Sequence, residues 1–209
     1  VYAGLAGDAA VAGVGARITP LPSVFQVRAG HVAGWVGVGG PGEGPGGADE
    51  WIQVGFSAFP GSVGNDIYYE VARPGSPITY HRVRAAVAPG VSMRLSVLEV
   101  HGRLDWWRVW VDGSPVSAPI HLPASHERWR PVVTAESWDG GTPACNDFLY
   151  QFGAVRIASS PGGTWHPLTA TTPIGGPSTI VLHRDGGTFD AAGGPVARRT
   201  LAESTHAGG

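Results

Sequence analysis

The sequence predicts a single all-β domain, a sandwich or barrel of short antiparallel strands, from its composition and from the spacing of its apolar runs. Apolar residues make up 43% of the chain, which is enough for a substantial core. The 33 glycines and 18 prolines follow no period and lie between the apolar runs, as turn residues do. We therefore expect residues 1–209 to form one domain, with residues 1–20 and 202–209 loosely ordered.

Strand-like runs recur along the chain and are separated by turn pairs such as Pro60-Gly61 and Asp112-Gly113. The predicted strands are Ser23–Val27, Gly34–Val38, Trp51–Phe59, Asp66–Ala72, Thr79–Val87, Val91–Val100, Asp105–Val111, Arg130–Trp138, Phe148–Ala158 and Ser178–His183, with a weaker last one at Val196–Leu201. This spacing is typical of a sandwich or barrel and not of alternating strands and helices.

Alternation of period 2 divides some of these strands into an apolar face and a face that is aromatic and polar. The aromatic and polar residues are Trp51 and Gln53, Tyr68 and Glu70, and Glu136 and Trp138. A sandwich buries its apolar faces, so these residues are expected on an outer face. If their strands share one curved sheet, they line a groove that suits an extended peptide or sugar polymer.

Gln53 and Glu136 form the sharpest catalytic hypothesis on this face. A carboxylate can deprotonate water and later protonate a leaving amine, while an amide N–H can stabilise the tetrahedral oxyanion. The ordinary alternative is two polar residues on a solvated face. Glu70 and Glu136 could instead be a carboxylate pair for glycoside hydrolysis, with the tryptophans stacking on sugar rings.

Other conspicuous residues give weaker signals. Trp106, Arg108 and Trp110 share one face of a predicted strand, and we interpret them either as a ligand-stacking platform or, preferably, as an aromatic core patch crossed by the arginine. His121 and His126 lack a third ligand at metal-like spacing and are expected to be surface histidines. Cys145 is the only cysteine, so no intramolecular disulfide can form.

Charge and hydropathy exclude several classes of partner. Charged residues make up 14% of the chain and the net charge is −2, which predicts no nucleic acid and no anionic membrane as partners. No apolar run is long enough to span a bilayer. We expect a monomer that is secreted, with its signal peptide removed before Val1.

Several motifs, taken in order, resemble those of the glutamic peptidases, the eqolisin family, in a bacterial-type form. They are Gly34-Trp35-Val36-Gly37, Ile52-Gln53-Val54-Gly55-Phe56, Tyr68-Tyr69-Glu70 after Asp66, Val91–Val100, Thr134-Ala135-Glu136-Ser137-Trp138 and Phe148–Ile157, with Ile180–Phe189 a weaker match. Each motif is short, and their order and gaps make the combination specific.

The resemblance implies a concanavalin-like (jelly-roll) sandwich of two curved antiparallel sheets with a concave substrate groove. It implies that Gln53 binds the oxyanion and that Glu136 is general base and then general acid, acting on a peptide or protein substrate without a metal or other cofactor. It places Trp35, Tyr68, Glu70 and Trp138 in the groove. With Trp51, which alternation puts on the same face, these are the residues expected to bind substrate.

The chain also departs from the family pattern at three positions. Gly39 or Gly40 and Ser57 stand where the family usually has acidic residues, and Ala72 stands where it has an aromatic one. This chain therefore has fewer carboxylates to support the catalytic pair than the family usually has. Two alternatives stay open: a carbohydrate-binding or carbohydrate-cleaving domain that uses the same groove, and a homologue repurposed for another reaction.

Overall fold

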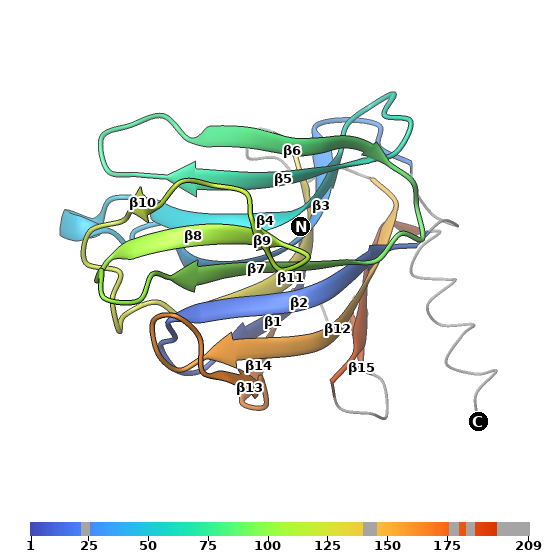
Figure 1. Ribbon diagram of the computed structural model, residues 1–209. Helices are drawn as coiled ribbons and strands as arrows, with labels where there is room; N and C mark the ends of the chain where they lie inside the picture. Colours follow the sequence, from blue (N-terminus) through green and yellow to red (C-terminus); the bar gives the residue numbers. More distant parts are fainter. Residues whose placement is uncertain (22–25, 140–145, 176–179, 183–186, 196–209) are drawn as a thin grey trace.

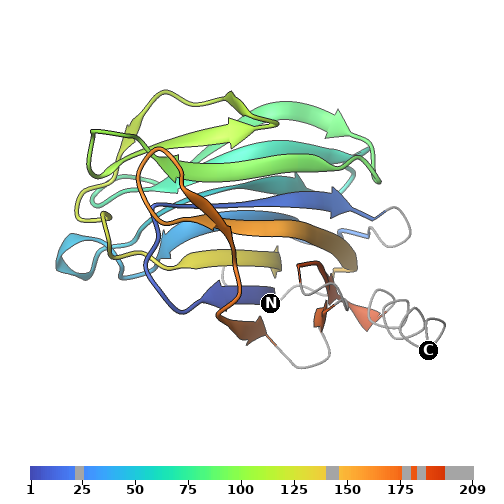
Figure 2. The same cartoon turned by 60° about the horizontal axis from the view of Figure 1, so that its bottom comes forward.

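The computed structural model describes residues 1–21, 26–139, 146–175, 180–182 and 187–195, which form a sandwich of two antiparallel sheets (Figures 1 and 2). Sheet I has the order β14 (Thr171–Gly175), β1 (Tyr2–Gly7), β11 (Pro131–Trp138), β3 (His31–Gly40), β4 (Glu50–Ala58), β5 (Asn65–Ala72) and β6 (Thr79–Val87). A short 3-10 turn, Pro45–Gly47, precedes β4.

Sheet II packs against it and has the order β10 (Ile120–His121), β8 (Trp106–Val111), β7 (Met93–Glu99), β2 (Gly13–Pro20), β12 (Phe148–Ala158), β16 (Phe189–Gly193) and β15 (Ile180–Leu182). The short strands β9 (Ser114–Pro115) and β13 (Trp165–Pro167) pair with β8 and β12. The predicted two-sheet sandwich is confirmed. No helix within the described ranges is long and apolar enough to cross a membrane.

The core lies between the two sheets and takes alternate residues of the central strands, among them β3, β4, β7 and β8. Val36 and Phe56 of sheet I and Val97, Trp107 and Phe152 of sheet II are fully buried there. Burial of this much apolar surface is the main stabilising term of the fold, at roughly 25 cal/mol per Å² removed from water. The opposite face of each sheet points away from this core.

The largest difference from expectation is at the N-terminus, where residues 1–20 were predicted to be loosely ordered. They form β1 and β2, which are both interior strands: β1 lies between β14 and β11, and β2 between β7 and β12. Glycine and alanine have low strand propensity, so the local sequence of these segments gives only a weak strand signal. Their strand structure is stabilised by pairing with strands that are distant in the sequence. Cys145, Val196–Leu201 and residues 202–209 lie outside the described residues.

The preferred interpretation of Trp106, Arg108 and Trp110 as an aromatic core patch is wrong, as their positions on β8 show. Trp107 is the core residue, and its Nε1–H donates to Ser125 Oγ at 2.8 Å. Trp106, Arg108 and Trp110 lie on the opposite, outer face of sheet II and are only partly buried. On this face the guanidinium of Arg103 lies 3.9 Å from the ring centre of Trp106.

The two histidines expected at the surface differ in their surroundings. His121 is exposed and stacks on Trp106 with ring centres 5.0 Å apart. His126 is half-buried, and its Nδ1 lies 2.9 Å from a carboxylate oxygen of Glu99, which has no exposed surface. This hydrogen bond raises the pKa of His126 despite the opposing effect of burial.

Candidate active site

The predicted catalytic and binding residues all lie on the face of sheet I that is turned away from sheet II. Their sequence neighbours Ile52, Val54, Ile67 and Ala135 belong to the main core, so alternation places Gln53, Tyr68 and Glu136 on the other side. Ala33, Trp35 and Tyr68 form a small separate apolar cluster there. We call this surface the site face.

Gln53 on β4 is oriented by Tyr68 on β5. The amide Nε2 of Gln53 donates to the Tyr68 hydroxyl at 3.0 Å. Burial and then the negative charge of Glu136 raise the pKa of Tyr68 well above its ordinary value, so the hydroxyl stays protonated. An amide nitrogen has two hydrogens, and one remains for a substrate oxygen.

Glu136 on β11 is flanked by two residues that the sequence did not single out. The Nε2 of His31 lies 3.3 Å from Glu136 Oε1, and Tyr2 lies directly opposite Glu136 in the pairing of β1 with β11. Burial and then the charge of Glu136 raise the pKa of Tyr2 to about 12. Glu136 is therefore held between a histidine and a protonated phenol.

Gln53 and Glu136 share the site face and come from strands that are not direct neighbours. Gln53 lies opposite Gly37 of β3, and Glu136 lies opposite Ala33 of the same strand, so β3 separates them and they are offset by four residues. The hydroxyl of Tyr68 accepts from Gln53, and the charge of Glu136 contributes to the raised pKa of this tyrosine. Together these groups could polarise a carbonyl and activate a water placed between them.

Trp51 and Glu70, two of the predicted binding residues, are hydrogen-bonded to each other on this face. The indole Nε1 of Trp51 donates to Glu70 Oε1 at 3.1 Å. Burial is the main cause that raises the pKa of Glu70; the Trp51 hydrogen bond opposes it and the charge of Glu136 adds to it. Glu70 lies directly opposite Gln53 in the pairing of β5 with β4 and so borders the pair Gln53 and Glu136, which we call the predicted dyad.

Two departures from the family pattern have structural explanations. Ser57 is buried, and its hydroxyl lies 2.9 Å from that of Tyr80, whose ring stacks on Tyr68 at 5.0 Å. This serine therefore supports the tyrosine that orients Gln53. Gly39 has a φ of +79°, and a Cβ there would lie 2.4 Å from the carbonyl oxygen of Glu50, so no acidic side chain fits at that position.

The exposure of the dyad is lower than a solvated sheet face would give. Gln53 is 7% and Glu136 is 6% exposed, although no second sheet covers them. Trp35 is also nearly buried. Trp138, by contrast, is 40% exposed, and its ring lies 6.5 Å from that of Tyr2. The site thus has a desolvated floor and an aromatic rim, which strengthens electrostatic effects at the floor.

The residues that sequence reasoning missed, Tyr2 and His31, come from strand ends that it left out. His31 shares its face with Ala33 and Trp35, so extending the predicted strand at Gly34–Val38 by three residues would have found it. Tyr2 lay in a segment expected to be loosely ordered. No group of three or more His, Cys, Asp and Glu side chains in the described ranges is arranged to hold a metal ion.

Comparison with known proteins gives a structural match and no sequence match. No family model and no curated protein sequence matches the chain. A crystal structure of scytalido-glutamic peptidase with a peptide-based transition-state analogue matches with a TM-score of 0.63 and 16% identity, over 93% of this chain and 98% of that one. SCP-B, an eqolisin-family peptidase in complex with the tripeptide Ala-Ile-His, matches with a TM-score of 0.61, 16% identity and the same coverage. The chain therefore has the fold of the glutamic peptidases.

Proposed function

We propose that this protein hydrolyses peptide bonds with Gln53 and Glu136 as its catalytic pair. The main support is that the site face holds Gln53, whose amide is bound to a protonated tyrosine, and Glu136, a nearly buried carboxylate whose charge contributes to the raised pKa of that tyrosine. These residues lie on a fold shared with peptidases that have been solved with a transition-state analogue and with a tripeptide. The same face supplies Trp35, Trp51 and Trp138 to contact an extended peptide.

The chemistry follows from the roles that each group can play. Glu136 removes a proton from water, and the water oxygen attacks the carbonyl carbon while the carbonyl π electrons move to oxygen. The free N–H of Gln53 donates to this oxyanion. Glu136, now protonated, gives its proton to the amide nitrogen, the C–N bond breaks, and an acid and an amine leave.

Neighbouring groups set the state of the pair. Tyr2, with its pKa raised to about 12, keeps its proton and can donate to the carboxylate of Glu136. Tyr68 holds the amide of Gln53 in one orientation, which reduces the reorganisation needed in the transition state. Trp51 and Glu70 border Gln53 and are assigned to substrate positioning.

A peptide pool provides the test. The native protein, incubated with mixed synthetic peptides at about pH 3 to 7, where a carboxylate base operates, is expected to produce new termini detectable by mass spectrometry. Cleavage is expected to survive a metal chelator, because the proposed groups need no ion. Neutral oligosaccharides form the parallel arm. Cleavage of sugars without cleavage of peptides would replace this proposal with the Glu70 and Glu136 glycosidase alternative.

A further inference from the structure

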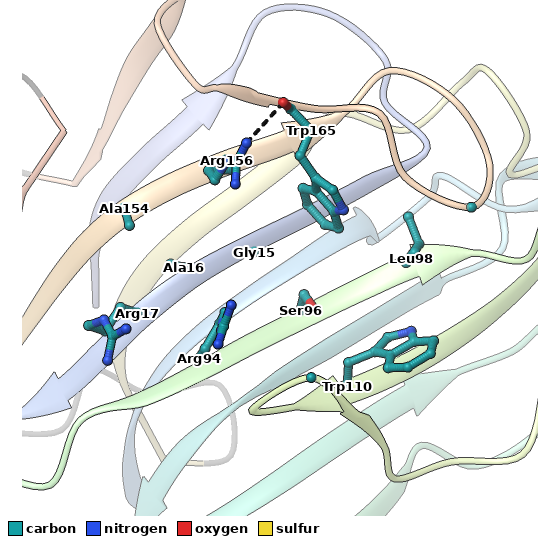
Figure 3. Close-up of a pocket in the computed structure, with 12 residues that line it drawn as sticks. Gly15, Ala16, Arg17, Arg94, Ser96, Leu98, Trp110, Ala154, Arg156 and Trp165 are labelled. Atoms are coloured by element: carbon teal, nitrogen blue, oxygen red, sulfur yellow. Dashed lines mark hydrogen bonds between the residues drawn. The ribbon is translucent and has the colours of Figure 1, made fainter.

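A recess lies on the outer face of sheet II, on the opposite side of the sandwich from the site face. It has a volume of about 430 Å³, within the range of small-molecule sites. Strands β2, β7, β8 and β12 form it, and the segment bearing β13 closes one side (Figure 3). Three exposed arginines, Arg17, Arg94 and Arg156, line it together with Trp110 and Trp165. We call this recess the arginine groove.

The register of the strands explains why the surface is hollow here. Across sheet II, Trp110 lies opposite Ser96, Ser96 opposite Gly15, and Gly15 opposite Arg156. Two small residues therefore form a floor between large side chains. A Cβ on Gly15 would lie 2.8 Å from that of Ser96, so any larger residue would disturb this floor. Figure 3 shows the indoles of Trp110 and Trp165 on the two sides.

The described residues do not balance the positive charge of the groove. Arg17 and Arg94 lie directly opposite each other on β2 and β7, an arrangement in which like charges destabilise a sheet. In the described part of the chain none of the three arginines forms an ion pair. Arg156 donates to the carbonyl oxygen of Trp165 at 3.0 Å, and Asp112 accepts only from the backbone N–H of Arg94. An anion bound between Arg17 and Arg94 would remove the repulsion.

The groove combines the hydrogen-bond donors of its arginines with the flat apolar faces of its two indole rings. This combination indicates which class of ligand would fit. Guanidinium groups bind carboxylates or sulfates through paired, charge-assisted hydrogen bonds. Indole rings pack against the apolar C–H face of a sugar ring. We propose that the arginine groove binds an acidic saccharide, with its carboxylates or sulfates on Arg17, Arg94 and Arg156 and its rings on Trp110 and Trp165.

Other anionic polymers fit this surface less well. Strands β7, β2 and β12 each pair on both sides, so no free edge is present to which a peptide could add as a strand. The net charge of the chain is −2, and only a few cations gather here, whereas nucleic acid is held by an extended basic track. The site is separate from Gln53 and Glu136 and does not depend on the proposed peptidase activity.

Calorimetric titration of the native protein tests the proposal with trigalacturonate, a sulfated trisaccharide and methyl-esterified trigalacturonate. We expect the charged sugars to bind and the neutral ester to bind at least about tenfold more weakly, because it cannot pair with guanidinium. In the Arg17→Gln/Arg94→Gln double variant the affinity for the charged sugars should fall at least about tenfold. Arg73→Gln, an exposed arginine elsewhere, is the matched control and should bind as the native protein does.

Thermal denaturation keeps the test independent of folding defects. Because Arg17 and Arg94 repel each other, the double variant should melt at the same temperature as the native protein or higher, and it should lose the stabilisation by trigalacturonate. Equal binding of charged and esterified sugars, or unchanged affinity in the double variant, would overturn the proposal. So would tighter binding of a mononucleotide or an oligo-aspartate peptide than of both charged sugars.

Discussion

Replacing Glu136 with glutamine is expected to lower kcat/KM for peptide hydrolysis by about 10²- to 10⁴-fold, the usual contribution of a general acid–base group. The change keeps the size of the side chain and removes its ability to take a proton from water. Gln53→Ala is expected to cost about 10²- to 10³-fold, the usual contribution of one oxyanion donor. The two losses should not add when combined, because both groups act on the same intermediate.

Matched controls separate this loss from a folding defect. Glu127→Gln changes an exposed carboxylate, and Gln151→Ala changes a glutamine of β12 on the other sheet. Both should keep native activity. Circular dichroism and thermal melting should show that the dyad variants are folded. If Glu136→Gln, once folded, retained more than about a third of native kcat/KM, Glu136 would not be the base.

Glu50→Gln is expected to stabilise the protein at neutral pH and to change it little in acid. Glu50 has no exposed surface, and neither carboxylate oxygen has a hydrogen-bond partner in the described residues. Burial, and then the charge of Asp105, raise its pKa from 4.5 to about 7, with Arg128 opposing. At pH values between 4.5 and about 7, Glu50 is therefore protonated in the folded state and ionised in the unfolded state.

The sign of the effect follows from that proton. As pH rises from 4.5 through about 7, the folded state must give up the proton in a buried position, so the free energy of unfolding falls. Glutamine resembles the protonated form and avoids this loss. At about pH 8 the variant should gain about 1–3 kcal/mol over the native protein. His126 acts in the same direction, since its raised pKa favours folding at low pH and that contribution disappears as pH rises.

Urea denaturation of native and variant proteins at about pH 4 and about pH 8 measures this difference. Glu43→Gln is the control, because Glu43 is a nearby exposed carboxylate whose neutralisation should change stability little at either pH. A Glu50→Gln variant that is less stable than the native protein at both pH values would show that the carboxylate has a partner that stabilises its charge.

The sequence predicted the elements whose local pattern is strong. The strands Thr79–Val87 and Phe148–Ala158 agree with β6 and β12, and alternation assigned Gln53, Tyr68 and Glu136 to the correct face. Period-2 alternation is a local property, so it survives in a single sequence. Burial of the dyad was not predictable, because it depends on how side chains from several strands close around it.

What the sequence could not provide comes from pairing between distant segments. Tyr2 meets Glu136 through the register of β1 and β11, and Arg17 meets Arg94 through that of β2 and β7. The spacing of these residues in the sequence does not predict that either pair lies together. The N-terminal strands are glycine- and alanine-rich, so their order is imposed by tertiary contacts. The arginine groove could not be predicted from the sequence for the same reason, because its residues come together only through the pairing of distant strands.

Binding of a tetrahedral analogue tests the catalytic pair most directly. In this ligand a hydroxymethylene group replaces the scissile amide of a cleaved peptide, and its affinity is compared by calorimetry with that of the product peptides. We predict that the native protein binds the analogue at least about 10²-fold more tightly than the products, and that Gln53→Ala and Glu136→Gln remove most of this preference. Equal preference for the analogue in the native protein and in both folded variants would contradict the account.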